Sequence, residues 1–211
     1  MAFWCVNFDG DAGPLGNEAR EYVLREGLRE SAWLMHYQYA HHGNTFQGNS
    51  DQLAATTKNW RAAAKIKVGD WLVAYLKPKR VFAVGQVVPR KHRDRYRGHE
   101  IHDDLIERTT KKRSHQYFDG IVEYSDAGAM YEDFTSTWKL PLTNDHTGEQ
   151  EIWPYPQRID VHAWQHVVPK GVKVEGPWRN VPPYLIQLSV FEIPEEFFDT
   201  IKRELKFSSQ R

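Results

Sequence analysis

The chain has 211 residues, of which 40% are hydrophobic, and its 28 Lys and Arg residues balance its 28 Asp and Glu residues. A chain of this length folds as one large or two small domains, with a core that needs neither disulfides nor metal. The single cysteine, Cys5, excludes a disulfide framework, and the zero net charge excludes the overall basic field of an obligate polyanion binder.

The first forty residues predict a strand, a helix and a second strand. Ala2–Phe8 is the first strand, and turn-forming Gly, Asp and Pro residues follow it. Asn17 is the expected N-cap of an amphipathic helix over Glu18–Arg29, which carries acidic residues in its first turn. Ser31–Tyr39 then places Trp, Met, Tyr and Tyr at every second position from Trp33, which indicates a strand with one aromatic face.

The next elements are a helix, a turn and a hairpin. Lys58–Ile66 is rich in helix formers, and Gly69-Asp70 supplies the turn. Trp71–Leu76 and Val81–Val88 are dense in β-branched and aromatic residues and predict two strands. Gly85, inside the second strand, marks a bulge or a close approach of the backbone to another group, as in a curved sheet.

The later part of the chain gives weaker patterns. We expect helices at Ile101–Lys112 and Pro194–Phe207, strands at Gln116–Tyr124, Thr135–Leu142, Arg158–Val168 and Tyr184–Glu192, and a turn or short helix at Ala127–Phe134. Helices and strands do not alternate strictly, so we predict an α+β fold around one curved or closed mixed sheet. No linker or repeat is visible, which favours a single domain over residues 1–211, either whole or excised from a longer protein.

Several of these pieces resemble the EVE domain of the PUA-like superfamily, which is related to YTH domains. The pieces, in the order of the family, are Phe3–Asn7, Lys58-Asn59-Trp60-Arg61, the Ile66–Asp70 turn, Trp71–Tyr75, Phe82–Val88, Leu185–Val190 and Ile193–Phe197. Together they contain 37 of the 211 residues. The resemblance implies a small curved mixed β-barrel with flanking helices, which accepts one extruded and commonly modified base in an aromatic pocket.

Basic residues concentrate in the middle of the chain. Residues 77–113 hold twelve Lys and Arg against five Asp and Glu, whereas residues 114–211 hold nine against fifteen. Clustered cations are what phosphate contact requires, although a solvated loop is the alternative. The candidate backbone-binding residues are Lys58, Arg61, Lys79, Arg80, Arg90, Lys91, Arg93, Arg95, Arg97, Lys111, Lys112 and Arg113.

Aromatic residues with polar neighbours form the candidate base-binding pocket. Its members are Trp33, Tyr37, Tyr39, Asn59 and Trp60, which combine stacking faces with an amide able to read a base edge. The alternative that these aromatics are core residues stays open, because large aromatics are buried more often than they line ligand sites. Trp153, Tyr155, Trp164 and Trp178 are a second aromatic group that can supply a pocket wall.

No enzyme signature is found. His162 and His166 lie in a predicted strand, too far apart to chelate one ion, and no Cys or third His stands at a customary zinc spacing. Asp103, Asp104 and Glu107 suggest a magnesium site but lack the Glu-x-Lys spacing of many nucleases, so charged helix surface is the better account. We expect no metal, no cofactor and no catalysis by this chain.

The sequence therefore predicts a nucleic-acid-binding module that reads an extruded base in DNA, such as 5-methylcytosine or a hydroxymethylated base. DNA is favoured over RNA, and the expected role is the specificity domain of a modification-dependent restriction or defence system, beside a nuclease or NTPase domain or subunit. The alternatives are a metal-dependent nuclease with an unrecognised site, and an RNA- or small-molecule-binding module that uses the same pocket. No basic leader or membrane span is visible, so a soluble cytoplasmic protein is expected.

Overall fold

The computed structural model describes residues 1–8, 16–35, 62–76, 80–91, 129–132, 137–143, 150–154, 157–174 and 190–210. Its elements are β1 (Phe3–Asn7), α1 (Gly16–Glu30), β2 (Ala32–Met35), β3 (Trp71–Leu76), β4 (Arg80–Val87), β5 (Tyr131–Glu132), β6 (Thr137–Thr143), β7 (Gln150–Pro154), β8 (Gln157–Gln165), β9 (Val172–Lys173), β10 (Val190–Ile193) and α6 (Glu195–Ser209).

Eight of the strands form one mixed sheet. Its hydrogen-bonded order is β10-β1-β3-β4-β8-β2, while β5 pairs with β8 and β9 pairs with β4 outside this path. β1 and β3 run parallel, and the other neighbours in this sheet are antiparallel. β6 and β7 form a separate two-stranded sheet, in which Trp138 stands opposite Trp153. The predicted α+β class with a mixed sheet is confirmed. Among the described strands, the two ends of the path, β10 and β2, do not pair with each other.

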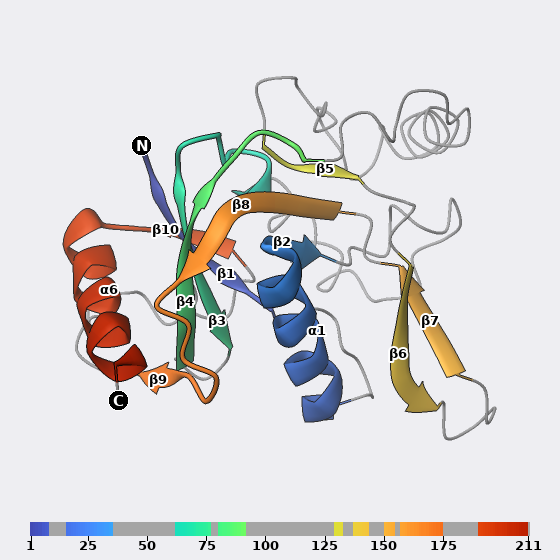
Figure 1. Ribbon diagram of the computed structural model, residues 1–211. Coiled ribbons are helices and arrows are strands. Elements are labelled where there is room, and N and C mark those ends of the chain that lie inside the picture. Colours follow the sequence, from blue (N-terminus) through green and yellow to red (C-terminus); the bar gives the residue numbers. More distant parts are fainter. Residues whose placement is uncertain are drawn as a thin grey trace, which may run out of the picture.

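The sheet buries side chains on both faces, and a different helix covers each face (Figure 1). Along β1 the side chains alternate, so Trp4 and Val6 join the core with α1, whereas Phe3 and Cys5 join the core with α6. The buried residues of α6 are Phe197, Phe198, Ile201 and Leu205. Their spacing gives the helix one apolar stripe, which packs onto the sheet. This double coverage explains why β1 and β3 read as continuous apolar runs.

The strands β4 and β8 are bent by a bulge next to Gly85. Gly85 pairs with Trp164 and Val87 pairs with Val161, so two residues of β8 stand opposite one residue of β4. A Cβ added at Gly85 would lie 3.0 Å from side-chain atoms of both Trp164 and Val161. The expectation of a bulge or close approach at this glycine is therefore confirmed, and the extra residue in β8 adds local twist and curvature to the sheet.

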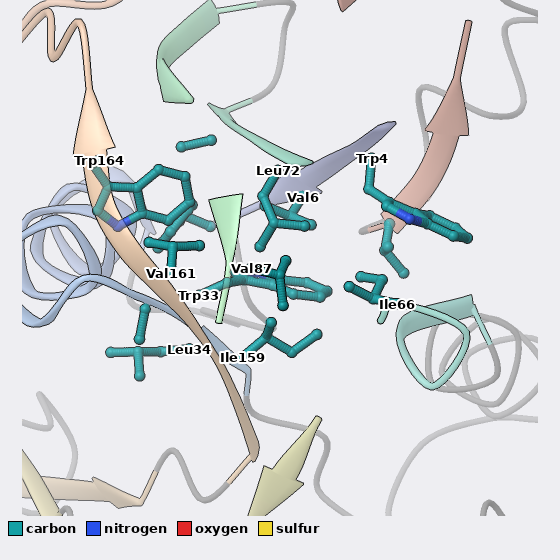
Figure 2. Close-up of a cluster of buried hydrophobic side chains, with 14 of the residues drawn as sticks. Trp4, Val6, Trp33, Leu34, Ile66, Leu72, Val87, Ile159, Val161 and Trp164 are labelled. Atoms are coloured by element: carbon teal, nitrogen blue, oxygen red, sulfur yellow. The ribbon is translucent and has the colours of Figure 1, made fainter. Parts of the chain in front are cut away.

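The curved sheet encloses the side chain of Trp33. Figure 2 shows its ring in the middle of the cluster, between Trp4 and Trp164, with Val87 and Ile159 close by. Trp33 comes from β2, and its indole N–H donates a 3.1 Å hydrogen bond to the Asn7 carbonyl of β1. Three strands, β3, β4 and β8, separate these two strands in the sheet order. The sheet therefore curls far enough for a side chain of one end strand to reach the carboxyl end of β1.

A buried carboxylate joins the N-terminus to the turn that precedes β3. Asp70 accepts hydrogen bonds from the backbone N–H of Ala2 at 2.8 Å, the indole N–H of Trp4 at 3.2 Å and the backbone N–H of Lys67 at 3.0 Å. The preceding Gly69 has φ +94°, a conformation that favours glycine. Gly69-Asp70 is thus the predicted turn, and the Asp70 side chain fixes the start of β1 beside the start of β3.

Most predicted elements in the described ranges are confirmed, and their ends differ by a few residues. β3 has the predicted bounds, and α1 begins at Gly16, so Asn17 lies inside the first turn and the N-cap prediction is wrong. The prediction of a turn or short helix at Ala127–Phe134 is wrong where β5 forms, and β7 and β9 lie where no strand was predicted. The predictions for Ile101–Lys112 and Gln116–Tyr124 lie outside the described residues.

No helix in the described ranges contains a segment long and apolar enough to cross a lipid bilayer.

Candidate nucleic-acid interface

Three members of the predicted phosphate-binding set lie in the described part of the chain. Arg80 is the exposed first residue of β4, opposite Lys173 of β9. Arg90 and Lys91 follow the other end of β4, whose eight residues span about 26 Å at roughly 3.3 Å per residue. The three residues therefore do not form one patch, because Arg80 lies at the opposite end of the strand from Arg90 and Lys91.

The segment that contains Arg90 and Lys91 is fastened to β8 by Asp160. The backbone N–H of Val88 donates a 3.0 Å hydrogen bond to the Asp160 carbonyl, and the backbone N–H of Lys91 donates a 2.8 Å bond to Asp160 Oδ2. Asp160 of β8 thus binds the backbone at two residues, Val88 and Lys91, which are three positions apart. Arg90 lies between these points and is half-buried.

Asp160 itself is held by Arg158, two residues earlier on the same face of β8. Arg158 Nε and Nη2 donate hydrogen bonds to Asp160 Oδ1 at 3.0 and 2.7 Å. The two residues are 1% and 0% exposed, respectively. Ile159, between them, points to the opposite face and belongs to the core beside α1. The pair is therefore a buried charged feature on the face of β8 opposite to Ile159.

The side chain of Lys91 lies at the C-terminal end of α1. Its ammonium is 3.4 Å from the carbonyl oxygen of Ser31, a residue with φ +52° that directly follows the helix. Burial lowers the pKa of the Lys91 ammonium from its ordinary value, whereas the Asp160 carboxylate acts in the opposite direction. A cation is favourable beside the carbonyl groups that end a helix. Lys91 therefore has a structural contact as well as an exposed charge.

Trp33 is a core residue. Its side chain is 1% exposed, and its indole N–H is engaged with the Asn7 carbonyl. An extruded base cannot stack on this ring without displacing the core side chains that surround it. The structure therefore supports the core alternative for Trp33 and removes it from the candidate pocket.

Trp164, from the second aromatic group, is also a core residue. It is 9% exposed, its indole N–H donates a 3.0 Å hydrogen bond to the Gly27 carbonyl of α1, and its ring meets that of Phe8 edge-on at 5.9 Å between centroids. Trp71 is half-buried, with the Phe198 ring 5.5 Å and the Lys202 ammonium 4.7 Å from its ring centroid. Among these described tryptophans, Trp71 is the one with a partly exposed ring.

The remaining predicted site residues lie outside the described part of the chain. For the pocket these are Tyr37, Tyr39, Asn59 and Trp60, and for the backbone they are Lys58, Arg61, Lys79, Arg93, Arg95, Arg97, Lys111, Lys112 and Arg113. Their assignment remains a prediction from the sequence.

The sequence reasoning missed Arg158 and Asp160. A signal was present, because two opposite charges alternate with Ile159 and Val161 at the start of the predicted strand. What the pattern did not provide was the partner, since the Lys91 N–H that Asp160 binds is 69 positions away in the chain. Within the described ranges, no group of three or more His, Cys, Asp or Glu side chains is arranged to hold a metal ion.

No protein-family model and no curated protein matches this chain.

Proposed function

We propose that the protein is a nucleic-acid-binding module that holds a phosphate backbone with the basic segment beginning at Arg90, and accepts an extruded, modified base of DNA against aromatic side chains. The observation that carries the proposal is the attachment of Arg90 and Lys91 to the sheet. The hydrogen bonds from Val88 and Lys91 to Asp160 fix the start of the most basic part of the chain to a rigid strand. Basic side chains on a fixed framework are suited to positioning a polyanion.

The fold adds support, and we propose that the curled sheet is a barrel of the PUA-like kind. The parallel pairing of β1 with β3, the β3–β4 hairpin and the final β10–α6 unit agree with the order of the pieces that resemble an EVE domain. The hydrogen bond from Trp33 to Asn7 draws β2 towards β1 by a side chain. A curled sheet with a filled interior must accept its base at the rim, since the interior is occupied by packed side chains.

With Trp33 in the core, we assign the pocket to Tyr37, Tyr39, Asn59 and Trp60. Tyr37 and Tyr39 follow β2 directly in the sequence. Extruding a base costs a few kcal/mol of lost stacking and pairing, and stacking on aromatic side chains returns about 1–3 kcal/mol per base. The amide of Asn59 would hydrogen-bond to the edge of the base and supply selectivity. Cleavage or translocation would then belong to a nuclease or NTPase partner.

A binding titration tests this function. Matched oligonucleotides carry cytosine, 5-methylcytosine, 5-hydroxymethylcytosine or N6-methyladenine, each as single strand and as duplex, and anisotropy is recorded at several salt concentrations. We expect tighter binding to one modified duplex, with log K falling linearly with log salt. Equal affinity for all duplexes removes the base-reading role, and an absence of salt-dependent binding removes the nucleic-acid role altogether. Magnesium-dependent cleavage by the isolated chain would favour the nuclease alternative.

The pocket assignment has its own test. Trp60→Ala should abolish the preference for the modified base while weak, salt-sensitive binding persists, because backbone contacts do not depend on the stacked base. Circular dichroism on the same sample separates this outcome from unfolding. A folded Trp60→Ala protein that keeps the full preference moves the pocket to Tyr37 and Tyr39, which the double substitution Tyr37→Leu with Tyr39→Leu then tests.

A further inference from the structure

Asp160 occupies a junction of three parts of the fold. It lies on β8, it binds the backbone of the segment that follows β4 at Val88 and Lys91, and the Lys91 ammonium reaches the Ser31 carbonyl at the end of α1. The Asp160 carboxylate uses Oδ1 for Arg158 and Oδ2 for the Lys91 N–H. Each carboxylate oxygen therefore has a separate and specific donor.

A buried ion pair is a weak source of stability for a fold. Taking an aspartate and an arginine out of water carries a desolvation penalty that their attraction often fails to exceed, and apolar side chains of similar volume are frequently as good or better. Arg158 and Asp160 are almost fully buried, so this penalty applies to both. What the ion pair provides, and an apolar pair would not, is a fixed acceptor for the Lys91 N–H.

We infer that Asp160, oriented by Arg158, is a positioning residue for phosphate recognition. It fixes the chain at Val88 and Lys91, so that Arg90 and Lys91 meet the backbone phosphates from one constant position on the sheet. Asp160 acts through these residues and touches no ligand itself. The inference rests on the proposed nucleic-acid function, and its ligand is the phosphate backbone, independent of which base is read.

The negative charge of Asp160 makes its positioning role testable. Replacing Asp160 by Asn removes one negative charge, and for a polyanionic ligand this change alone would strengthen binding. If Asp160 positions Arg90 and Lys91, the same substitution should instead weaken binding, because an amide cannot serve both donors as the carboxylate does. The two accounts predict opposite signs.

Asp70→Asn is the matched control. Asp70 is also a buried carboxylate that accepts backbone N–H groups, at Ala2 and Lys67, and the substitution changes the net charge by the same amount. Both variants should lose thermal stability. Only Asp160→Asn should also lose affinity for a duplex oligonucleotide and lower the slope of log K against log salt, by about 0.9 for each phosphate that is no longer neutralised.

A second variant covers the case in which Asp160→Asn fails to fold. The double replacement Arg158→Met with Asp160→Leu keeps the net charge and the approximate volume of the pair, and removes the acceptor of the Lys91 N–H. We expect a folded protein with the same weakened binding and reduced salt slope, and with faster amide hydrogen exchange at Lys91. The parent and both variants are titrated with one duplex at several salt concentrations, after circular dichroism has shown each to be folded.

The outcomes separate the two proposals. If the parent binds and the folded variants bind with the parent's affinity and salt slope, Asp160 is merely structural and the inference is overturned, while the proposed function stands. Tighter binding by Asp160→Asn, as the charge change alone predicts, overturns the inference as well. If the parent shows no salt-dependent binding, the proposed function fails and the inference fails with it.

Discussion

The indole N–H of Trp33 donates a hydrogen bond to the backbone carbonyl of Asn7, with 3.1 Å between the nitrogen and the oxygen. This bond joins β2 to β1 across the inside of the sheet, although β3, β4 and β8 lie between them in the hydrogen-bonded order. A large and almost fully buried side chain thus also satisfies a polar group at the end of the first strand. Trp33 is consequently a structural centre of the fold.

The first prediction concerns Trp33. Trp33→Ala should lower the free energy of unfolding by about 3–5 kcal/mol, because it leaves a large cavity in a closely packed core. Trp33→Phe keeps much of the volume, loses the hydrogen bond, and should be less destabilising. Urea denaturation followed by circular dichroism measures both. Phe207→Ala, at a side chain that is 55% exposed, is the control and should change stability by less than about 0.5 kcal/mol. A native-like stability for Trp33→Ala would return this residue to the pocket.

The second prediction concerns the turn before β3. Gly69 has φ +94°, and an added Cβ would meet no heavy atom within 4 Å, so a substitution is opposed by backbone strain alone. Gly69→Val should therefore cost more than about 1 kcal/mol of stability. The neighbouring Val68 is exposed in the same turn, so Val68→Ala serves as its control and should be nearly neutral. Coincident denaturation curves for Gly69→Val and the parent would contradict the strain argument.

The third prediction concerns Cys5. Its thiol is fully buried in β1, and burial raises its pKa well above the usual range. Because the folded-state pKa exceeds that of the unfolded chain, the corresponding stability is complete below the ordinary thiol pKa and is lost as pH rises towards the folded-state value. Native protein should not react with a thiol reagent at mildly alkaline pH, and denaturant should expose one reactive thiol. Rapid labelling of native protein would show that β1 opens readily.

The fourth prediction concerns the basic segment. Replacing Arg93, Arg95 and Arg97 by Ala should weaken binding to modified and unmodified duplexes alike, because phosphate contacts carry no base information. The slope of log K against log salt should fall by about 0.9 for each phosphate that these residues neutralise, measured by anisotropy titration.

The control for this triple variant has the same change in net charge. It replaces Lys65, Lys170 and Arg203, three exposed basic residues elsewhere on the molecule. Its salt slope should stay close to that of the parent, since these residues lie outside the proposed interface. Equal slopes for the two triple variants would mean that only total charge matters, and the segment from 93 to 97 would lose its assigned role.

Local chemistry explains which parts of the fold were predictable. The turn at Gly69-Asp70 and the strand β3 are both marked in the sequence. The turn has a Gly-Asp pair, whose glycine has positive φ in the structure, and the strand is an apolar run of six residues. The sequence also indicated a bulge or close approach at Gly85, but not its partner Trp164, which stands 79 positions later in the chain. The two-residue strand β9 has no periodicity to detect, because so short a segment contains less than two repeats of a strand.

The candidate site was less predictable for a related reason. An aromatic residue such as Trp33 shows the same alternating sequence pattern whether its side chain faces a ligand or the core. Strands that are distant in sequence determine which of the two it faces. Here β4 and β8 contribute Val87 and Ile159 to the surroundings of Trp33, and neither is near it in sequence. The anchoring of Lys91 likewise depends on Asp160, so the charge run was visible while its attachment was not.

The position of β1 between two strands that come much later in the sequence affects how this chain folds. β1 lies between β3 and β10, with Phe3 opposite both Trp71 and Ile193. Because β1 is synthesised before both of its neighbours, it gains the second of them only after the chain has been made as far as Ile193. Contacts between residues so distant in sequence slow folding, and apolar segments such as β1 remain exposed to solvent until their partner strands have formed. Newly made chains should consequently depend on chaperones until α6 has formed, and refolding should be most prone to aggregation at high protein concentration.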